Sequence, residues 1–74
     1  MDNYSVEYGN FIKERRLKMG LTQEEVSKKL GISQVAYGRY ELGLREPKFR
    51  LMLKISEVLD FKPGEFFDSV ERSE

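Results

Sequence analysis

The stretch that decides the fold is residues 22–43, TQEEVSKKLGISQVAYGRYELG. Thr22 is followed three residues later by Glu25, the pattern of a capping box, in which each side chain accepts a hydrogen bond from the other residue's backbone N–H. Gly31 can adopt the left-handed conformation that ends a helix, and Ser33 is placed to cap the next one. The spacing predicts two short helices joined by a turn of about three residues, which is a helix-turn-helix.

Helix signals also dominate the rest of the chain. The helices expected from caps, prolines and glycines cover 6–19, 22–30, 34–42, 47–59 and 63–68, with the chain frayed from Ser69. Ser5 is the candidate N-cap of the first helix, and Pro47 and Pro63 are expected to start the last two. No segment alternates for long between apolar and polar residues, so no strand is predicted. We therefore expect an all-α domain over residues 1–68, followed by a short acidic polar tail, 69–74.

Apolar residues at helical spacing supply the candidate core. Residues three or four apart lie on one face of a helix, so their side chains can pack together. The residues expected to face inward are Tyr8, Phe11, Ile12, Leu17, Val26, Leu30, Ala36, Tyr37, Tyr40, Phe49, Leu51, Met52, Ile55, Val58, Leu59, Phe66 and Phe67. Small Ser27 and Ala36 would let the two helices of the motif approach closely.

Length and composition exclude several classes of protein. The 74 residues suffice for one small domain, and the chain contains no Cys and no His. It therefore has no disulfide framework and lacks the commonest general base and zinc ligand. No apolar run exceeds the three residues 51–53, so no membrane span or signal peptide is predicted. We expect a cytoplasmic protein that is not an enzyme, with no catalytic residue, cofactor or metal.

The formal net charge of zero hides an uneven distribution along the chain. Residues 1–50 carry ten basic and seven acidic side chains, whereas residues 51–74 carry three basic and six acidic ones. A basic face on a small domain is typical of a protein that meets an anionic partner. Solvated helix faces of random sign would give the same pattern, and charge alone leaves both interpretations open.

From Ile12 to Asp68 the chain resembles the lambda-repressor-like helix-turn-helix family, the Cro and phage-repressor type also called the xenobiotic-response-element family. The residues that carry the resemblance are Ile12-Lys13-Glu14-Arg15-Arg16, Gly20-Leu21-Thr22-Gln23-Glu24-Glu25, Leu30-Gly31-Ile32-Ser33-Gln34, Arg39-Tyr40-Glu41, Glu46-Pro47 and Lys54-Ile55 through Leu59. The resemblance implies a compact five-helix domain whose third helix, 34–42, enters the major groove of double-stranded DNA. It also implies a transcriptional regulator, expected to be a repressor, that binds a pseudo-palindromic operator as a homodimer. Such a protein would be prokaryotic or phage-encoded and associated with the nucleoid.

The family's functional positions are implied for particular residues of this chain. The base-contacting positions are Gln34, Val35, Gly38 and Arg39; the backbone-contacting ones are Gln23 and Ser33, with Arg45 and Lys48 as further candidates; and Arg16 with Glu41 matches a structural ion pair. The chemistry agrees, because Gln34 can bond both N6 and N7 of adenine and Arg39 can bond O6 and N7 of guanine. Val35 offers an apolar contact for a thymine methyl group. For Arg45 and Lys48, a solvated charge is the equal alternative.

Three features leave alternatives open. Gly38 costs roughly 1 kcal/mol inside a helix, and either close approach to DNA or tolerated drift would account for it. Leu42 and Leu44 stand where many relatives have polar groups, which favours a second hypothesis: a protein-interaction adaptor or antitoxin-type partner in which DNA binding is secondary. Phe61, with the two phenylalanines 66–67, would either form the dimer surface or close the core.

Overall fold

The computed structural model describes residues 3–72, with side chains to Val70, and this part of the chain contains helices and no strand. The helices are α1 (Tyr4–Lys18), α2 (Gln23–Leu30), α3 (Gln34–Glu41), α4 (Phe49–Val58) and α5 (Gly64–Arg72). The predicted all-α class with five helices is therefore confirmed. No helix in the described range is long and apolar enough to span a membrane.

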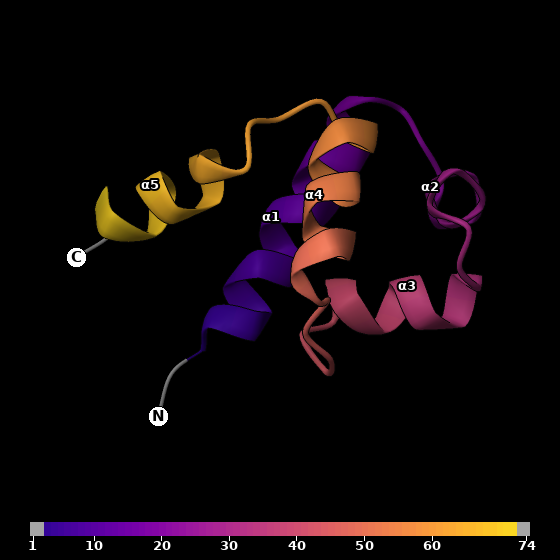
Figure 1. Cartoon of the computed structure of the whole chain (residues 1–74), viewed down its shortest axis with the longest axis horizontal. Helices are drawn as coiled ribbons and strands as arrows, with labels where there is room; N and C mark the ends of the chain where they lie inside the picture. The colour runs from indigo at the N-terminus through magenta and orange to yellow at the C-terminus, as the bar shows by residue number, and fades with distance from the viewer. Residues whose placement is uncertain (1–2, 73–74) are drawn as a thin grey trace.

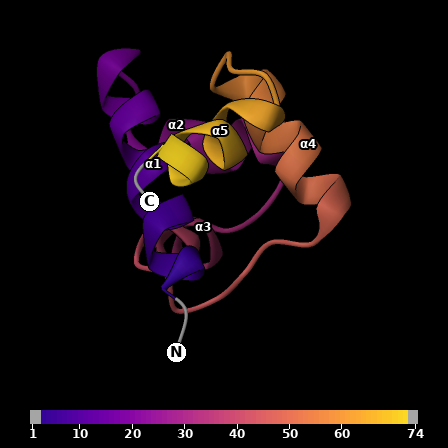
Figure 2. The same ribbon diagram turned by 90° about the vertical axis from the view of Figure 1, so that its left-hand side faces the viewer.

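The motif helices and the last helix lie at opposite ends of the molecule. Figure 1 shows α1 and α4 in the middle, α2 and α3 on one side of them and α5 on the other. In Figure 2, turned so that the opposite end faces the viewer, α5 lies in front of α1. The helix-turn-helix is thus free to meet a partner without interference from α5.

The turn between α2 and α3 follows the predicted local chemistry. The Glu25 N–H donates to Thr22 Oγ1 at 3.1 Å and the Thr22 N–H donates to Glu25 Oε1 at 2.9 Å, which completes the capping box. Gly31 ends α2 with a φ of 74°, and the Ser33 side chain accepts the Ala36 N–H at 3.1 Å to cap α3. These contacts involve close neighbours in the sequence, so the sequence predicts them well.

Several helix boundaries were predicted wrongly. Ser5 is not a cap: α1 follows Asn3, and the Ser5 hydroxyl donates instead to Glu46 Oε1 at 2.8 Å, linking α1 to the loop before α4. Pro47 is buried ahead of α4, whose N-cap is Lys48. The helix expected over 63–68 instead runs from Gly64 to Arg72, so the chain is not frayed at Ser69; residues 73–74 of the expected tail lie outside the described residues.

One core joins α1 to α5. The buried apolar residues are Tyr8, Ile12, Val26, Leu30, Tyr37, Ile55, Leu59, Phe61 and Phe66. Three residues expected to face inward, Leu17, Phe49 and Phe67, are instead more than half exposed. On α1 the buried residues Tyr8, Ile12 and Arg16 are spaced four apart and lie on one face. Leu17 lies outside this stripe. Phe66 packs edge-on against Tyr8, with ring centroids 5.2 Å apart, and so leaves its neighbour Phe67 on the outside.

The backbones of α1 and α3 touch at Gly9. A Cβ placed there would lie 2.4 Å from the carbonyl oxygen of Glu41 and 2.6 Å from that of Tyr40. A larger residue at this position would push the two helices apart. Gly9 therefore fixes how closely the C-terminal end of α3 sits against α1.

An ion pair beside this contact holds the same two helices. Arg16 Nε lies 2.6 Å from Glu41 Oε2, and Arg16 Nη2 donates to Glu41 Oε1 at 3.0 Å, so the pairing is two-pronged. Both residues are buried, and Arg16 Nη1 also donates to the Leu21 carbonyl at 2.9 Å. Gln23 Nε2 donates to Glu41 Oε1 at 2.9 Å and brings α2 into the network. The ion pair between Arg16 and Glu41 forms as expected.

Both members of this pair are charged at neutral pH. Burial raises the pKa of Glu41, but the hydrogen bond from Arg16, with smaller contributions from Tyr37 and Gln23, outweighs burial and leaves that pKa below its ordinary value of 4.5. The hydrogen bond to Glu41 correspondingly raises the pKa of Arg16. The Tyr37 hydroxyl interacts with the pair electrostatically, but within the described structure it has no hydrogen-bond partner at ordinary geometry.

We predict that Glu41→Gln lowers the free energy of unfolding at pH 7 by about 3–5 kcal/mol, because it leaves the buried Arg16 without a counter-charge. Urea denaturation measures this loss. Glu24→Gln is the matched control: its carboxylate lies 3.7 Å from Lys28 in an exposed pair, and its loss is expected to stay within about 0.5 kcal/mol.

The same pair predicts a pH dependence. Because folding lowers the pKa of Glu41, its contribution to stability is present above the ordinary value of 4.5 and is lost as the pH falls through the folded-state value. The difference between the unsubstituted protein and Glu41→Gln should therefore shrink on acidification. Equal losses for Glu41→Gln and Glu24→Gln at pH 7 would contradict this account.

Candidate nucleic-acid interface

The outer face of α3 forms one side of a shallow open groove. The groove is lined by Gln23, Gln34, Val35, Gly38, Arg39, Leu42 and Leu44. Its lining includes all four residues expected to contact bases, and these come from both turns of α3. Gln34, Val35 and Arg39 are exposed, so their side chains are available to a partner.

The Arg39 side chain forms no hydrogen bond or ion pair within the described part of the chain. Glu41 and Glu46, the two acidic residues that follow Arg39 most closely in the sequence, have other partners: Glu41 binds Arg16, and Glu46 accepts the Ser5 hydroxyl. No ion pair involves Arg39 among the described residues. Its guanidinium can therefore make a two-pronged contact to an outside acceptor.

Gln23 connects the groove to the network behind it. It is the first residue of α2 and is half-buried, and one hydrogen of its side-chain amide is used by Glu41. A helix N-terminus attracts anions through its free N–H groups and its dipole. Glu41 thus fixes the Gln23 side chain at the position where the resemblance implies a phosphate contact.

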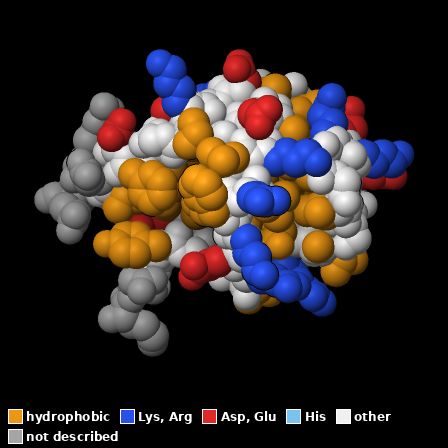
Figure 3. Space-filling model, viewed as in Figure 1, with side chains coloured by type: hydrophobic (Ala, Val, Ile, Leu, Met, Phe, Trp, Pro, Cys, Tyr) orange, Lys and Arg blue, Asp and Glu red, His pale blue; other side chains and the backbone are white. Residues whose placement is uncertain are grey.

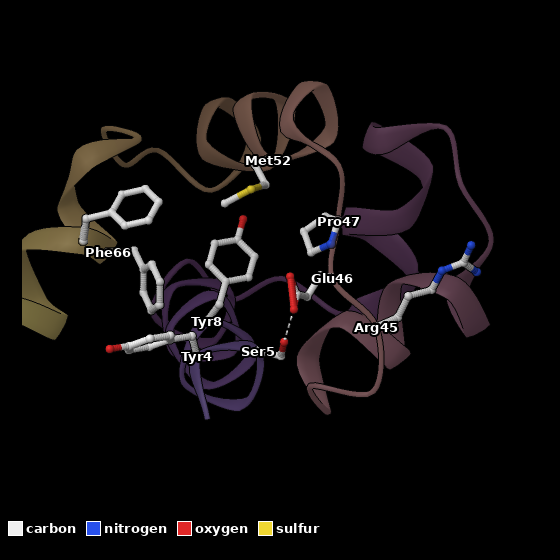
Figure 4. A pocket seen from close by; sticks show the side chains of 9 residues that line it. Tyr4, Ser5, Tyr8, Arg45, Glu46, Pro47, Met52 and Phe66 are labelled. Carbon is white, nitrogen blue, oxygen red and sulfur yellow. Dashed lines mark hydrogen bonds between the residues drawn. The ribbon is translucent and has the colours of Figure 1, made fainter. Parts of the chain in front are cut away.

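The remaining expected backbone contacts lie around the start and the end of α3. Ser33 uses a lone pair of its hydroxyl oxygen to cap α3, which leaves the O–H free to donate. Arg45 and Lys48 are exposed in the loop between α3 and α4. Figure 3 shows Lys and Arg side chains gathered over the side of the molecule that carries α3, and Arg45 extends outward from this loop in Figure 4.

The sequence did not single out Leu42 and Leu44 as lining residues of this groove. Val35, Leu42 and Leu44 have 66%, 68% and 74% of their surface exposed, respectively, so three of the seven lining residues present exposed apolar side chains. The spacing of Val35 and Leu42, seven residues apart, could have revealed that both lie on the face of α3 that carries Gly38.

The sequence also missed Gly9 and Arg15, which position the helices from behind. Arg15 Nη2 donates to the carbonyls of Leu59 and Asp60, so it satisfies the C-terminal end of α4. Its guanidinium also lies 5.9 Å from the centroid of the Phe61 ring. A glycine in the middle of an otherwise good helix was the available signal for Gly9.

The described residues that line the groove include no acidic side chain. Among residues 3–70, no group of three or more His, Cys, Asp or Glu side chains could hold a metal ion. Burial raises the pKa of Tyr8 and Tyr37, and the contact between Arg16 and Glu41 raises the pKa of Arg16 and helps to lower that of Glu41; none of these four residues lines the groove. The exposed amide, guanidinium and apolar groups suit the edges of bases in a major groove.

Comparison with known proteins shows which family contains this helix-turn-helix. A helix-turn-helix family model matches residues 12–66. The chain is 45% identical over 49 residues to the HTH-type transcriptional regulator YqaE of Bacillus subtilis, a match that covers 66% of this chain and 42% of YqaE. It is 40% identical over 60 residues to the HTH-type transcriptional regulator YqaF of the same organism, covering 81% of this chain and 79% of YqaF. The chain thus spans less than half of the length of YqaE but most of the length of YqaF.

A solved structure agrees with this grouping. The restriction-modification controller protein C.AhdI from Aeromonas hydrophila superposes with a TM-score of 0.79 at 32% sequence identity, covering 84% of this chain and 94% of that one. The family model covers well over half of the chain and includes the groove residues on α2 and α3. The chain belongs to the helix-turn-helix family of transcriptional regulators, of the Cro and xenobiotic-response-element type.

Proposed function

We propose that this protein is a sequence-specific transcriptional repressor that reads DNA with the segment 34–42 and acts as a homodimer. The observation that carries the proposal is that Gln34, Val35, Gly38 and Arg39 meet in one accessible groove on α3. The buried pair between Arg16 and Glu41 supports it, since this pair holds α3 against α1 and preorganises the reading face.

The proposed contacts divide into base reading and positioning on the backbone. Gln34 reads adenine and Arg39 reads guanine, each through two hydrogen bonds, while Val35 meets a thymine methyl group. The backbone contacts come from Gln23, Ser33, Arg45 and Lys48. These contacts fix the register of α3 without adding sequence information.

The relatives support a cytoplasmic, nucleoid-associated regulator of a prokaryote or phage, because YqaE and YqaF are transcriptional regulators of a bacterium. We assign DNA binding to residues 1–68. Of the residues assigned to the acidic tail, 69–72 continue α5.

We predict that Gln34→Ala weakens binding to the protein's preferred site by a factor that corresponds to about 1–3 kcal/mol and relaxes the preference at one base pair. Arg45→Ala should instead weaken binding to all sequences alike and reduce the slope of log K against log salt by about one. Fluorescence anisotropy on specific and random duplexes, over a range of salt concentrations, separates the two effects. If Gln34→Ala loses equal affinity on both duplexes, it does not read a base.

The proposed dimer surface differs from the one expected from the sequence. Phe61 and Phe66 are buried and close the core, whereas Phe67 and Phe49 are exposed. Two neighbouring hollows at the α1, α4 and α5 end share Tyr8, Met52 and Phe67 in their linings. Apolar side chains gather over this end in Figure 3. A second copy of the chain would cover this surface.

Tyr8 lies beneath the same surface. Its hydroxyl is buried without a hydrogen-bond partner in the described structure. Figure 4 shows it directed toward Met52, which lines the same hollow. An unsatisfied buried hydroxyl costs free energy, but this one is enclosed by the chain, so a second copy docked on the surface would not reach it. The proposed dimer surface therefore rests on the exposed rings.

We predict that the protein sediments as a dimer and that Phe67→Asp shifts it to the monomer, because a carboxylate would be buried in the interface. Analytical ultracentrifugation over a range of concentrations measures this. Leu17 is another exposed apolar residue and lines neither hollow, so Leu17→Asp should leave the dimer intact. A monomer for the unsubstituted chain at every concentration would overturn the dimer proposal.

A second candidate is a protein-interaction adaptor, favoured by the exposure of Leu42 and Leu44. Apolar side chains exposed next to each other mark protein contact sites on many surfaces. A purified partner that still binds the double variant Gln34→Ala, Arg39→Ala, together with no DNA binding by the unsubstituted chain, would support this function over the first.

A further inference from the structure

Three residues form a stripe along the outer face of α3. Val35, Gly38 and Leu42 are spaced i, i+3 and i+7, so they lie on one face of the helix and its C-cap. The two apolar side chains are exposed, and Gly38 lies between them with no side chain. All three line the same groove.

Packing within the chain does not require glycine at position 38. A Cβ at Gly38 would approach a single neighbouring atom, Gln23 Oε1, at 3.4 Å, which is ordinary contact. The backbone there is helical, unlike Gly43, whose φ of 74° favours glycine. Gly9, by contrast, is required by the 2.4 Å approach of the Glu41 carbonyl. Glycine weakens a helix interior, and packing inside the described structure does not account for it at position 38.

We propose that the hollow at Gly38, walled by Val35 and Leu42, is a seat for the C5-methyl group of a thymine in the major groove. Thymine is the base that presents a methyl group there, and its other major-groove atom is an acceptor. A hollow with apolar walls and no donor of its own fits the methyl group. This inference rests on the proposed function and adds Gly38 as the floor of the seat and Leu42 as a further specificity-determining residue.

The neighbours of the hollow make the occupant specific. Gln34 and Arg39 line the same groove and carry the hydrogen-bonding groups for adjacent base pairs. Leu42 has no group that could bind a phosphate, so its exposed side chain contributes apolar contact alone. A cytosine at the same position has no methyl group to fill the hollow.

The test removes the methyl group from the DNA. Sites selected from random duplexes by the full chain are resynthesised with each dT replaced in turn by dU, which keeps the hydrogen-bonding groups and lacks the methyl group. We expect one thymine in each half-site at which the replacement weakens binding about fourfold, the factor that corresponds to burial of one methyl group. Competition binding in a single salt buffer measures the ratio.

The variants locate the seat on the protein. Gly38→Ala places a methyl group in the hollow, so this variant should no longer bind the dT site better than the dU site. Gly64→Ala is the matched control, because Gly64 is also helical, has nothing within 4 Å of an added Cβ and lies on α5. It should keep the full preference. Leu42→Ala removes one wall and should reduce the preference without abolishing binding.

The outcomes distinguish this inference from the function on which it rests. If selection enriches no duplex, DNA reading fails and the thymine seat fails with it. If a site is enriched and dU binds as well as dT at every position, the seat alone is overturned. The seat is also overturned if Gly38→Ala keeps the same dT preference as Gly64→Ala.

Discussion

The position of α3 depends on the buried contact between Arg16 and Glu41. This pair joins α1 to the last residue of α3, and through Gln23 it also holds the start of α2. Close approach at Gly9 brings the same helices together at the backbone, so charge and shape fix one arrangement. A pair of this kind is expensive to bury, and its value is geometric: it presents the outer side of α3 at a constant angle to whatever it meets.

Local chemistry was readable from the sequence, and distant contacts were not. The capping box at Thr22, the left-handed Gly31 and the Ser33 cap each involve residues within a few positions, so their pattern predicted the motif. The pairing of Arg16 with Glu41 spans 25 residues, and only the family resemblance anticipated it. The link from Ser5 to Glu46 spans 41 residues and had no sequence signal.

The candidate site was anticipated in its polar part and incomplete in its apolar part. Gln34 and Arg39 are recognisable because their chemistry matches base edges. In the sequence, Leu42 stood out only as an apolar residue where many relatives have a polar one, and the structure places it in the groove with Val35 and Gly38. Which phenylalanines face out was unreadable as well, since a one-residue shift on α5 decides that Phe66 is buried and Phe67 is not.

Selection of binding sites from random duplex DNA by the full chain tests the central claim most directly. If α3 reads bases as a pair of symmetric copies, the enriched sequences will contain two related half-sites in inverted orientation, with centres about 34 Å apart along the duplex. If no sequence is enriched over the starting pool even at low salt, where phosphate contacts are strongest, the groove on α3 does not read DNA.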